Sequence, residues 1–281
     1  MSGWHAQLQI DYARASDKTV AKFQHTGPLR VLQSLYPEGE GVCHNVLVHP
    51  PSGLVGGDTL DIRLHVQPHA HALLTTPGAT RFYRSEQGLA AQCVHAVVED
   101  GARLEWLPLE TLAYNGCHGL NQAVFDLRGQ AELLAWDITA LGLPQANLPF
   151  VQGQLQQHLE VKDVWLERGL LDAEDDRLMN GPLGLAKQRC MASLVWASGS
   201  EISRERRELA LSIARQVCEQ AQGQVPLQVH AGVTSPHSRV VVMRTLSPLV
   251  EPAQTLLRQV WANWRKALWQ MGDQVPRIWS M

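Results

Sequence analysis

The sequence predicts a mainly β fold, a stacked-sheet or solenoid-like β region, with a small α+β lobe at the carboxyl end that carries two helices. Short apolar runs separated by glycine and proline turns fill the chain from Leu8 to about Val161. Helical periodicity is nearly absent there and appears in the last third of the chain. We expect the β-rich region to span residues 1–189 and the lobe residues 190–281, packed together as one structural unit.

Individual strands are expected where apolar residues cluster between turn signals. The stretch from Leu60 to Val66 alternates, with an apolar residue at every second position, which is typical of a strand buried on one face. No fixed sequence period is visible, so a regular repeat protein is not supported. The strands expected in this region include 29–33, 45–49, 60–66 and 93–98.

The last third is expected to follow the order β-α-β-β-α. A strand over 190–196 precedes an amphipathic helix over about 203–221, which is expected to end near Gly223. Two further strands are expected around 227–230 and 240–244. The predicted apolar face of the helix consists of Leu209, Ile213, Val217 and Ala221.

A second helix is expected to begin near Ser247 and Pro248, because serine caps helix starts and proline suits the first turn. Its tryptophans, Trp261, Trp264 and Trp269, do not all fit one face. Core packing is expected for most of them, and an anchoring role at a partner protein is the alternative.

Composition and charge restrict the classes of function. The chain has 281 residues, 45% of them hydrophobic and 18% charged, and a formal net charge of −3. This charge does not predict binding to nucleic acid or to an anionic membrane surface. The arginines at 204–207 are interrupted by acidic residues, as is typical of a solvated helix face. No secretory signal or bilayer-spanning run is present, and the five cysteines lack metal-site spacing. We expect a cytoplasmic protein.

Familiar catalytic motifs are missing. The chain contains no G-x-x-x-x-G-K-[ST], H-E-x-x-H or G-x-S-x-G sequence. The turn at Gly56 and Gly57 is explained by positive φ or close backbone approach. Asp58 follows it and has two interpretations, a cap that accepts backbone N–H bonds or a ligand-binding carboxylate.

Histidines and acidic residues in apolar strands are the remaining candidates. The histidines are expected to be exposed or hydrogen-bonded, because their spacing does not show the converging ligands that a metal site needs. Joint chelation by Cys43 and His44 is disfavoured, since neighbours on a strand point to opposite faces. Glu105, Asp137 and Glu167 each lie near a tryptophan in apolar β sequence. Such a carboxylate either faces water or lines a polar interior, where it needs partners, ions or water.

A series of motifs runs through the whole chain in order. It comprises Gly27–Val31, Leu35–Gly39, Cys43–His44, His49–Asp58, Leu73–Ser85, Leu104–Glu110, Leu134–Asp137 and Pro276–Trp279. Each motif alone is weak, but the ordered series resembles the urease accessory protein family UreD, also called UreH. One departure is Leu143, where relatives usually carry arginine.

The resemblance implies a scaffold or metallochaperone that helps to incorporate nickel into urease. It implies contacts with apo-urease and with UreF, which recruits the GTPase UreG, no tightly bound cofactor, and an internal passage for transient nickel. The acidic positions matching that passage are Asp58, Asp137 and Glu167, with Glu105 as an addition. Isolated carboxylates suit a passage because several imidazoles or thiolates would hold nickel too tightly to release it.

Two other functions stay open on the residues alone. A pure adaptor would bridge proteins and never contact metal. A carboxylate-based hydrolase would use two of the acidic residues as acid and base on a β scaffold. An enzyme would turn over a substrate alone, whereas a scaffold would be inert alone and would co-purify with its partners. The missing motifs and the resemblance together lead us to expect no enzymatic activity.

Overall fold

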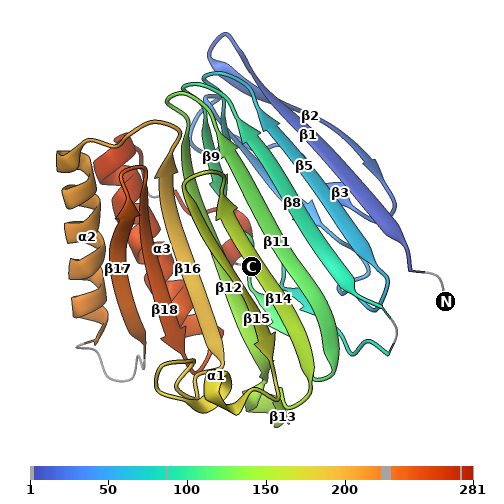
Figure 1. Ribbon diagram of the computed structural model, residues 1–281. Coiled ribbons are helices and arrows are strands. Elements are labelled where there is room, and N and C mark those ends of the chain that lie inside the picture. Colours follow the sequence, from blue (N-terminus) through green and yellow to red (C-terminus); the bar gives the residue numbers. More distant parts are fainter. Residues whose placement is uncertain (1–2, 87, 223–228, 273, 281) are drawn as a thin grey trace.

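Two stacked β-sheets and a pair of long helices make up the fold (Figure 1). The computed structural model describes residues 3–86, 88–222, 229–272 and 274–280. Over these residues the first sheet has seven strands, in the order β15-β14-β11-β8-β5-β1-β2. Their bounds are β1 (His5–Ala15), β2 (Lys18–Thr26), β5 (Thr59–Val66), β8 (Ala90–Val98), β11 (Cys117–Leu127), β14 (Gly153–Val161) and β15 (Trp165–Asp172).

The second sheet follows the order β17-β18-β16-β12-β9-β6-β4-β3, with three short strands attached. Its main strands are β3 (Arg30–Val31), β4 (Val42–Val48), β6 (His71–Thr75), β9 (Arg103–Trp106), β12 (Glu132–Leu143), β16 (Cys190–Ser198), β17 (His230–His237) and β18 (Val240–Ser247). The short strands are β7 (Thr80–Phe82), β10 (Thr111–Ala113) and β13 (Leu148–Pro149). The helices are α1 (Asp176–Asn180), η1 (Pro144–Ala146), α2 (Arg204–Gln222), α3 (Val250–Trp269) and η2 (Arg277–Ser280).

The middle of the molecule is a solenoid of parallel strands. The chain passes alternately between the sheets, from β5 to β6, β8, β9, β11, β12 and β14. Each return brings it back in the same direction, so β5, β8, β11 and β14 pair in parallel in one sheet, as do β4, β6, β9 and β12 in the other. Strands outside this parallel set, such as β2, β15 and β16, pair antiparallel with their neighbours. The mainly β, solenoid-like prediction is confirmed.

The second sheet separates two apolar cores. One core fills the space between the sheets and contains Leu60, Ile62, Leu64 and Val66, so the predicted alternation is confirmed. The other lies between the opposite face of the second sheet and the helices α2 and α3. Figure 1 shows both helices at the β16–β17 side of the molecule. Among the described residues, no helix combines the length and apolar character that crossing a bilayer requires.

The buried face of α2 agrees with the prediction in part, because Val217 and Ala221 are buried and Ile213 is half-buried. Ser203 Oγ accepts a hydrogen bond from Arg206 N, so the helix begins where expected. Leu209, however, is 44% exposed, whereas Ala210 and Ala214 are fully buried. These small residues let the helix lie close to α3, whose Trp264 donates to Ala210 O at 2.9 Å. The predicted stop at Gly223 lies outside the described residues.

The start of α3 also differs. β18 continues to Ser247, which pairs with Cys190, and the helix begins at Val250 after an N-cap without a side-chain hydrogen bond. The expected serine cap is therefore wrong, since the Ser247 hydroxyl donates to Leu249 O at 2.6 Å instead. Ser247 belongs to β18 because the backbone of this residue completes the hydrogen-bond ladder with β16.

The three tryptophans of α3 are all buried, Trp264 completely. Core packing is thus confirmed for each, and an exposed anchor is not formed. Arg206 is not part of a purely solvated face either, because its guanidinium lies 2.9 Å from Glu132 on β12. The expected strand at 29–33 shrinks to the two residues of β3, and the short helix α1 was not predicted.

Candidate functional site

Three amide side chains form a row between the two sheets. Gln92 on β8, Asn121 on β11 and Gln157 on β14 are buried, and Asn121 lies in register with both of the others. Because these strands are parallel, equivalent side chains repeat about every 4.8 Å across the sheet. Gln92 Nε2 donates to Asn121 Oδ1 at 3.1 Å, which links the first two amides.

A row of threonines faces these amides. Thr80 on β7, Thr111 on β10 and Thr139 on β12 are in register with one another. Asn121 Nδ2 contacts Thr111 Oγ1 at 3.3 Å and Gln157 Nε2 contacts Thr139 Oγ1 at 3.1 Å. The two rows make a polar band within a largely apolar core. With Asp137, we call it the interior polar stripe: Thr80, Gln92, Thr111, Asn121, Asp137, Thr139 and Gln157.

Asp137 is the charged member of the stripe. Its Oδ2 accepts from Asn121 Nδ2 at 2.7 Å, and its Oδ1 accepts from Thr139 Oγ1 at 2.8 Å and from Gln157 Nε2. Burial, with a contribution from the charge of Glu167, raises the pKa of Asp137 to about 6, because the three neutral donors offset only part of the desolvation. The carboxylate is therefore ionised at neutral pH and close to its protonation range.

Glu167 lies beyond Asp137 at the β15 edge of the first sheet. Its Oε1 accepts from Ser193 Oγ at 2.9 Å, and its Oε2 lies 2.5 Å from Arg244 Nε. Ser193 on β16 is the register partner of both Asp137 on β12 and Arg244 on β18. Glu167 thus reaches across from one sheet to the middle of a row on the other.

The stripe reaches a cavity at its opposite end. This cavity of about 280 Å³ lies between the loop after β4 and β7, and its walls include His49, Thr80, Arg81 and Gln92. Further in, a space of about 10 Å³ is bounded by Thr80, Gln92 and Asp137, among others. Such a volume holds about one water molecule. The stripe is therefore polar along its length and narrow beside Asp137, which is half-buried.

Asp58 lies in the loop before β5, away from these contacts. Its two oxygens accept backbone N–H bonds from Val55 at 3.0 Å and Trp4 at 3.3 Å. Gly57 has φ +90°, as predicted for the preceding turn. The loop-capping interpretation of Asp58 is confirmed, and its assignment to a nickel passage remains a prediction.

Glu105 lies on the opposite face of the second sheet, under α3. Trp261 Nε1 donates to its Oε2 at 2.6 Å, and His71 Nε2 lies 2.8 Å from its Oε1. Arg265 Nε is 3.2 Å from Oε2, an ion-pair distance without hydrogen-bond alignment. Burial alone would raise the pKa of Glu105, but the hydrogen bond from His71 and the charge of Arg265 hold it below its ordinary value.

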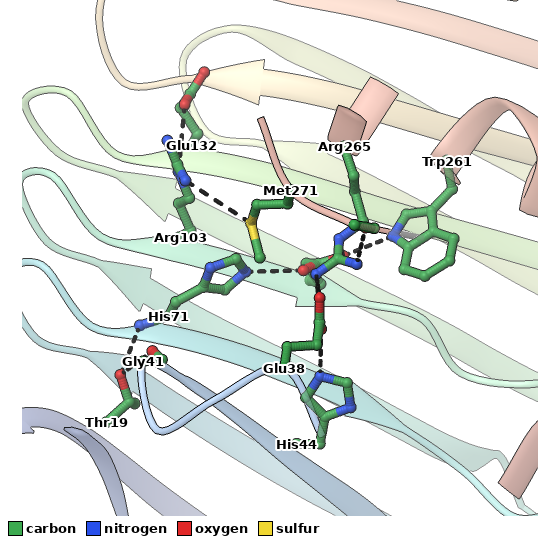
Figure 2. A network of polar contacts seen from close by, with 12 residues as sticks. Thr19, Glu38, Gly41, His44, His71, Arg103, Glu132, Trp261, Arg265 and Met271 are labelled. Atoms are coloured by element: carbon green, nitrogen blue, oxygen red, sulfur yellow. Dashed lines mark hydrogen bonds and ion pairs between the residues drawn. The ribbon is translucent and has the colours of Figure 1, made fainter. Parts of the chain in front are cut away.

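Arg265 joins Glu105 to a second carboxylate, that of Glu38, and Figure 2 shows Arg265 beside Glu38. Its Nη2 lies 2.8 Å from both oxygens of Glu38, and Glu38 Oε1 also pairs with His44 Nε2 at 2.8 Å. Burial lowers the pKa of His71 and favours the neutral ring. We call this group the helix-side cluster: Glu38, His44, His71, Glu105, Trp261 and Arg265. Both of its carboxylates are already engaged by Arg265 and by hydrogen-bonding protein groups.

The structure thus separates the four predicted acidic residues. Asp137 and Glu167 come together between the sheets, whereas Asp58 and Glu105 lie elsewhere, and Glu105 is not water-facing. Hydrogen-bonded histidines are confirmed at His44 and His71. Among the described residues, no group of three or more His, Cys, Asp or Glu side chains is arranged to hold a metal ion. All five cysteines are free thiols.

Sequence reasoning did not identify the amides and threonines of the stripe. Gln92 and Asn121 each interrupt the apolar side of an alternating strand, next to Val94 and Ala123 respectively. That interruption is the available signal. The register between strands decides which of these polar residues become neighbours across the sheet, and no sequence period indicates that register.

Comparisons with known proteins agree with the motif series. Residues 5–280 match the family described as UreD urease accessory protein. A protein of Albidiferax ferrireducens is 58% identical over 278 residues, and one of Polaromonas sp. strain JS666 is 56% identical, with 99% of both chains covered in each case. A protein of Leptothrix cholodnii is 47% identical over 98% of this chain and 99% of its own. Each of these relatives is named urease accessory protein UreD.

Proposed function

This chain belongs to the UreD family of urease accessory proteins, and we propose that it bridges apo-urease to a UreF–UreG complex and passes nickel along its interior polar stripe. The observation that carries the second half of the proposal is the position of Asp137. Its carboxylate is the charged end of a continuous row of neutral oxygen and amide groups, and Glu167 follows directly behind it.

The chemistry of the stripe suits an ion that must move on. Nickel binds imidazole and thiolate more firmly than carboxylate, amide or hydroxyl oxygen, so oxygen groups favour release. A transport path needs this compromise between admission and retention. The amides support it in a second way, since each can rotate to present oxygen instead of nitrogen to a cation.

The size of the stripe adds a condition to the proposal. The space of about 10 Å³ beside Asp137 admits roughly one water molecule, so a nickel ion with its hydration shell does not fit into this space. Side chains around Asp137 have to move for transit, and binding of a partner is the event we assign to this opening. A hydrolase that uses Asp137 is not proposed, because the space beside this carboxylate is too small for a substrate.

The narrow space is also the specific observation that favours the alternative function, a pure adaptor. In that case the chain would bridge urease and UreF without contacting nickel, and the stripe would be structural. The five free cysteines fit a reducing compartment under either function, which supports the proposed cytoplasmic location.

Urease maturation in cells tests the proposal. Asp137→Asn and Glu167→Gln are expected to co-purify with urease and UreF while urease activity and nickel content fall. Matched controls are Asp126→Asn on β11 and Glu160→Gln on β14. Both carboxylates lie at the outer surface of the first sheet, where Asp126 pairs with Arg128 and Glu160 pairs with His158. Complexes that form and mature normally with the stripe variants would favour the adaptor. Loss of activation in the controls as well would reject a role specific to the stripe.

A further inference from the structure

We propose that Arg244 is a built-in counter-ion, which occupies the carboxylate of Glu167 in the metal-free chain and is displaced when a divalent cation arrives. This inference rests on the proposed function and concerns the β15 end of the stripe. It assigns to Arg244 a positioning role, in that the residue sets how readily Glu167 becomes available to a cation.

The contacts of Glu167 define what a cation would meet. One oxygen is held by Ser193 Oγ at 2.9 Å and the other by Arg244 Nε at 2.5 Å. A hydroxyl can keep its position beside a bound ion, because it can rotate to present its oxygen lone pairs. A guanidinium has no acceptor and carries a positive charge, so it has to leave.

The exposure of the two partners shows which of them can move. The side chain of Arg244 is 51% exposed and that of Glu167 is 19% exposed. The guanidinium therefore reaches the carboxylate from the solvent side and can turn back to water without becoming a buried, unpaired charge. The guanidinium also lies over the Trp165 ring, 5.7 Å from its centroid, and this ring offers a surface on which it can rest.

Charge balance gives the exchange its direction. Asp137 and Glu167 carry up to two negative charges at neighbouring levels, and the charge of Glu167 helps to raise the pKa of Asp137. Arg244 neutralises one of these charges, whereas a divalent cation neutralises both. The dication is thus favoured over the guanidinium where both carboxylates are within reach, and Arg244 closes the site again after the ion has left.

Nickel binding to the full-length chain tests this role. Equilibrium dialysis with Ni²⁺ is expected to give an apparent Kd about fivefold lower for Arg244→Gln than for the unchanged chain, the factor that an ion pair of this exposure contributes. Arg244→Lys, which keeps the charge, is expected to show a smaller change. The matched control is Arg239→Gln, because Arg239 lies in the same β17–β18 hairpin and contacts the backbone oxygens of Gly199 and Asp163.

Dependence on Glu167 is the decisive part of the test. In a Glu167→Gln background, Arg244→Gln is expected to leave the Kd unchanged. An unaltered Kd in Arg244→Gln alone, or a gain that persists without Glu167, overturns the proposal. Arg244→Met replaces Arg244→Gln if thermal unfolding shows that the latter does not fold.

The outcome is separate from that of the proposed function. Activation that requires Asp137, combined with an Arg244→Gln chain of unchanged Kd, removes the counter-ion and keeps the passage. A Glu167-dependent gain in affinity supports the counter-ion even if urease activation proves indifferent to Asp137→Asn.

Discussion

The two faces of the second sheet hold arginine–glutamate pairs of opposite character. On the helix side, Arg265 and Glu105 are both fully buried, and both oxygens of Glu105 are in hydrogen bonds, with His71 and Trp261. On the side facing the first sheet, Arg244 is half exposed and a single carboxylate, Glu167, is its ion-pair partner among the described residues. A pair sealed on all sides fixes a helix to a sheet, whereas a pair open to water can exchange. Burial of the cation distinguishes the two.

Arg265→Met is expected to have the largest effect on stability. It leaves Glu38 and Glu105 buried without their cation, and breaking such a pair costs about 3–5 kcal/mol of unfolding free energy. Urea denaturation measures the loss, and Lys266→Met, at an exposed position of the same helix, is the control. A loss below about 1 kcal/mol would mean that the helix-side cluster behaves like a surface pair.

Asp137→Asn is expected to stabilise the chain at alkaline pH. The folded pKa of about 6 lies above the ordinary 3.8, so the folded chain binds this proton more tightly than the unfolded chain. The contribution of Asp137 to the unfolding free energy is therefore favourable in acid and is lost as pH rises through about 6, by up to about 3 kcal/mol. The variant should lack this dependence.

Unfolding at pH 5 and pH 8 checks this expectation. The difference in stability between Asp137→Asn and the unchanged chain should be largest at pH 8 and shrink towards pH 5. A difference independent of pH would show that the carboxyl does not titrate as inferred. The amides of the stripe can flip to suit an asparagine, so steric loss is not expected.

Trp261→Phe is expected to cost about 2 kcal/mol, because Glu105 loses a charge-assisted hydrogen bond. Trp269→Phe is the matched control: Trp269 is also buried in α3, but among the described residues its Nε1 has no hydrogen-bond partner. Thermal unfolding of both variants separates the hydrogen bond from the loss of ring volume. Equal losses would assign the effect to packing.

Arg244→Gln is expected to have the smallest effect on stability, below about 1 kcal/mol, as for other exposed ion pairs. Denaturation at low and at high salt measures it, since salt weakens the pair further. A loss as large as that of Arg265→Met would show that the contrast between the two faces is wrong.

The sequence indicated the β architecture more fully than the site. Alternation from Leu60 to Val66 is local, so it was readable, and the β-α-β-β-α order of the last third followed from periodicity in the same way. The boundary at Ser247 failed because pairing with Cys190 outweighed a local capping signal. Asp137 and Glu167 lie near each other because of the way the two sheets stack, and the sequence around either residue does not indicate that stacking.

The contact between Glu38 and Arg265 joins residues 227 positions apart in the chain. Synthesis proceeds from the amino terminus, so Glu38 and Glu105 leave the ribosome long before the arginine that neutralises them. Contacts of such long sequence separation also form slowly. A nascent chain is therefore expected to carry an uncovered apolar sheet face with unpaired acids until α3 emerges, so the earlier strands depend on α3 for protection from aggregation.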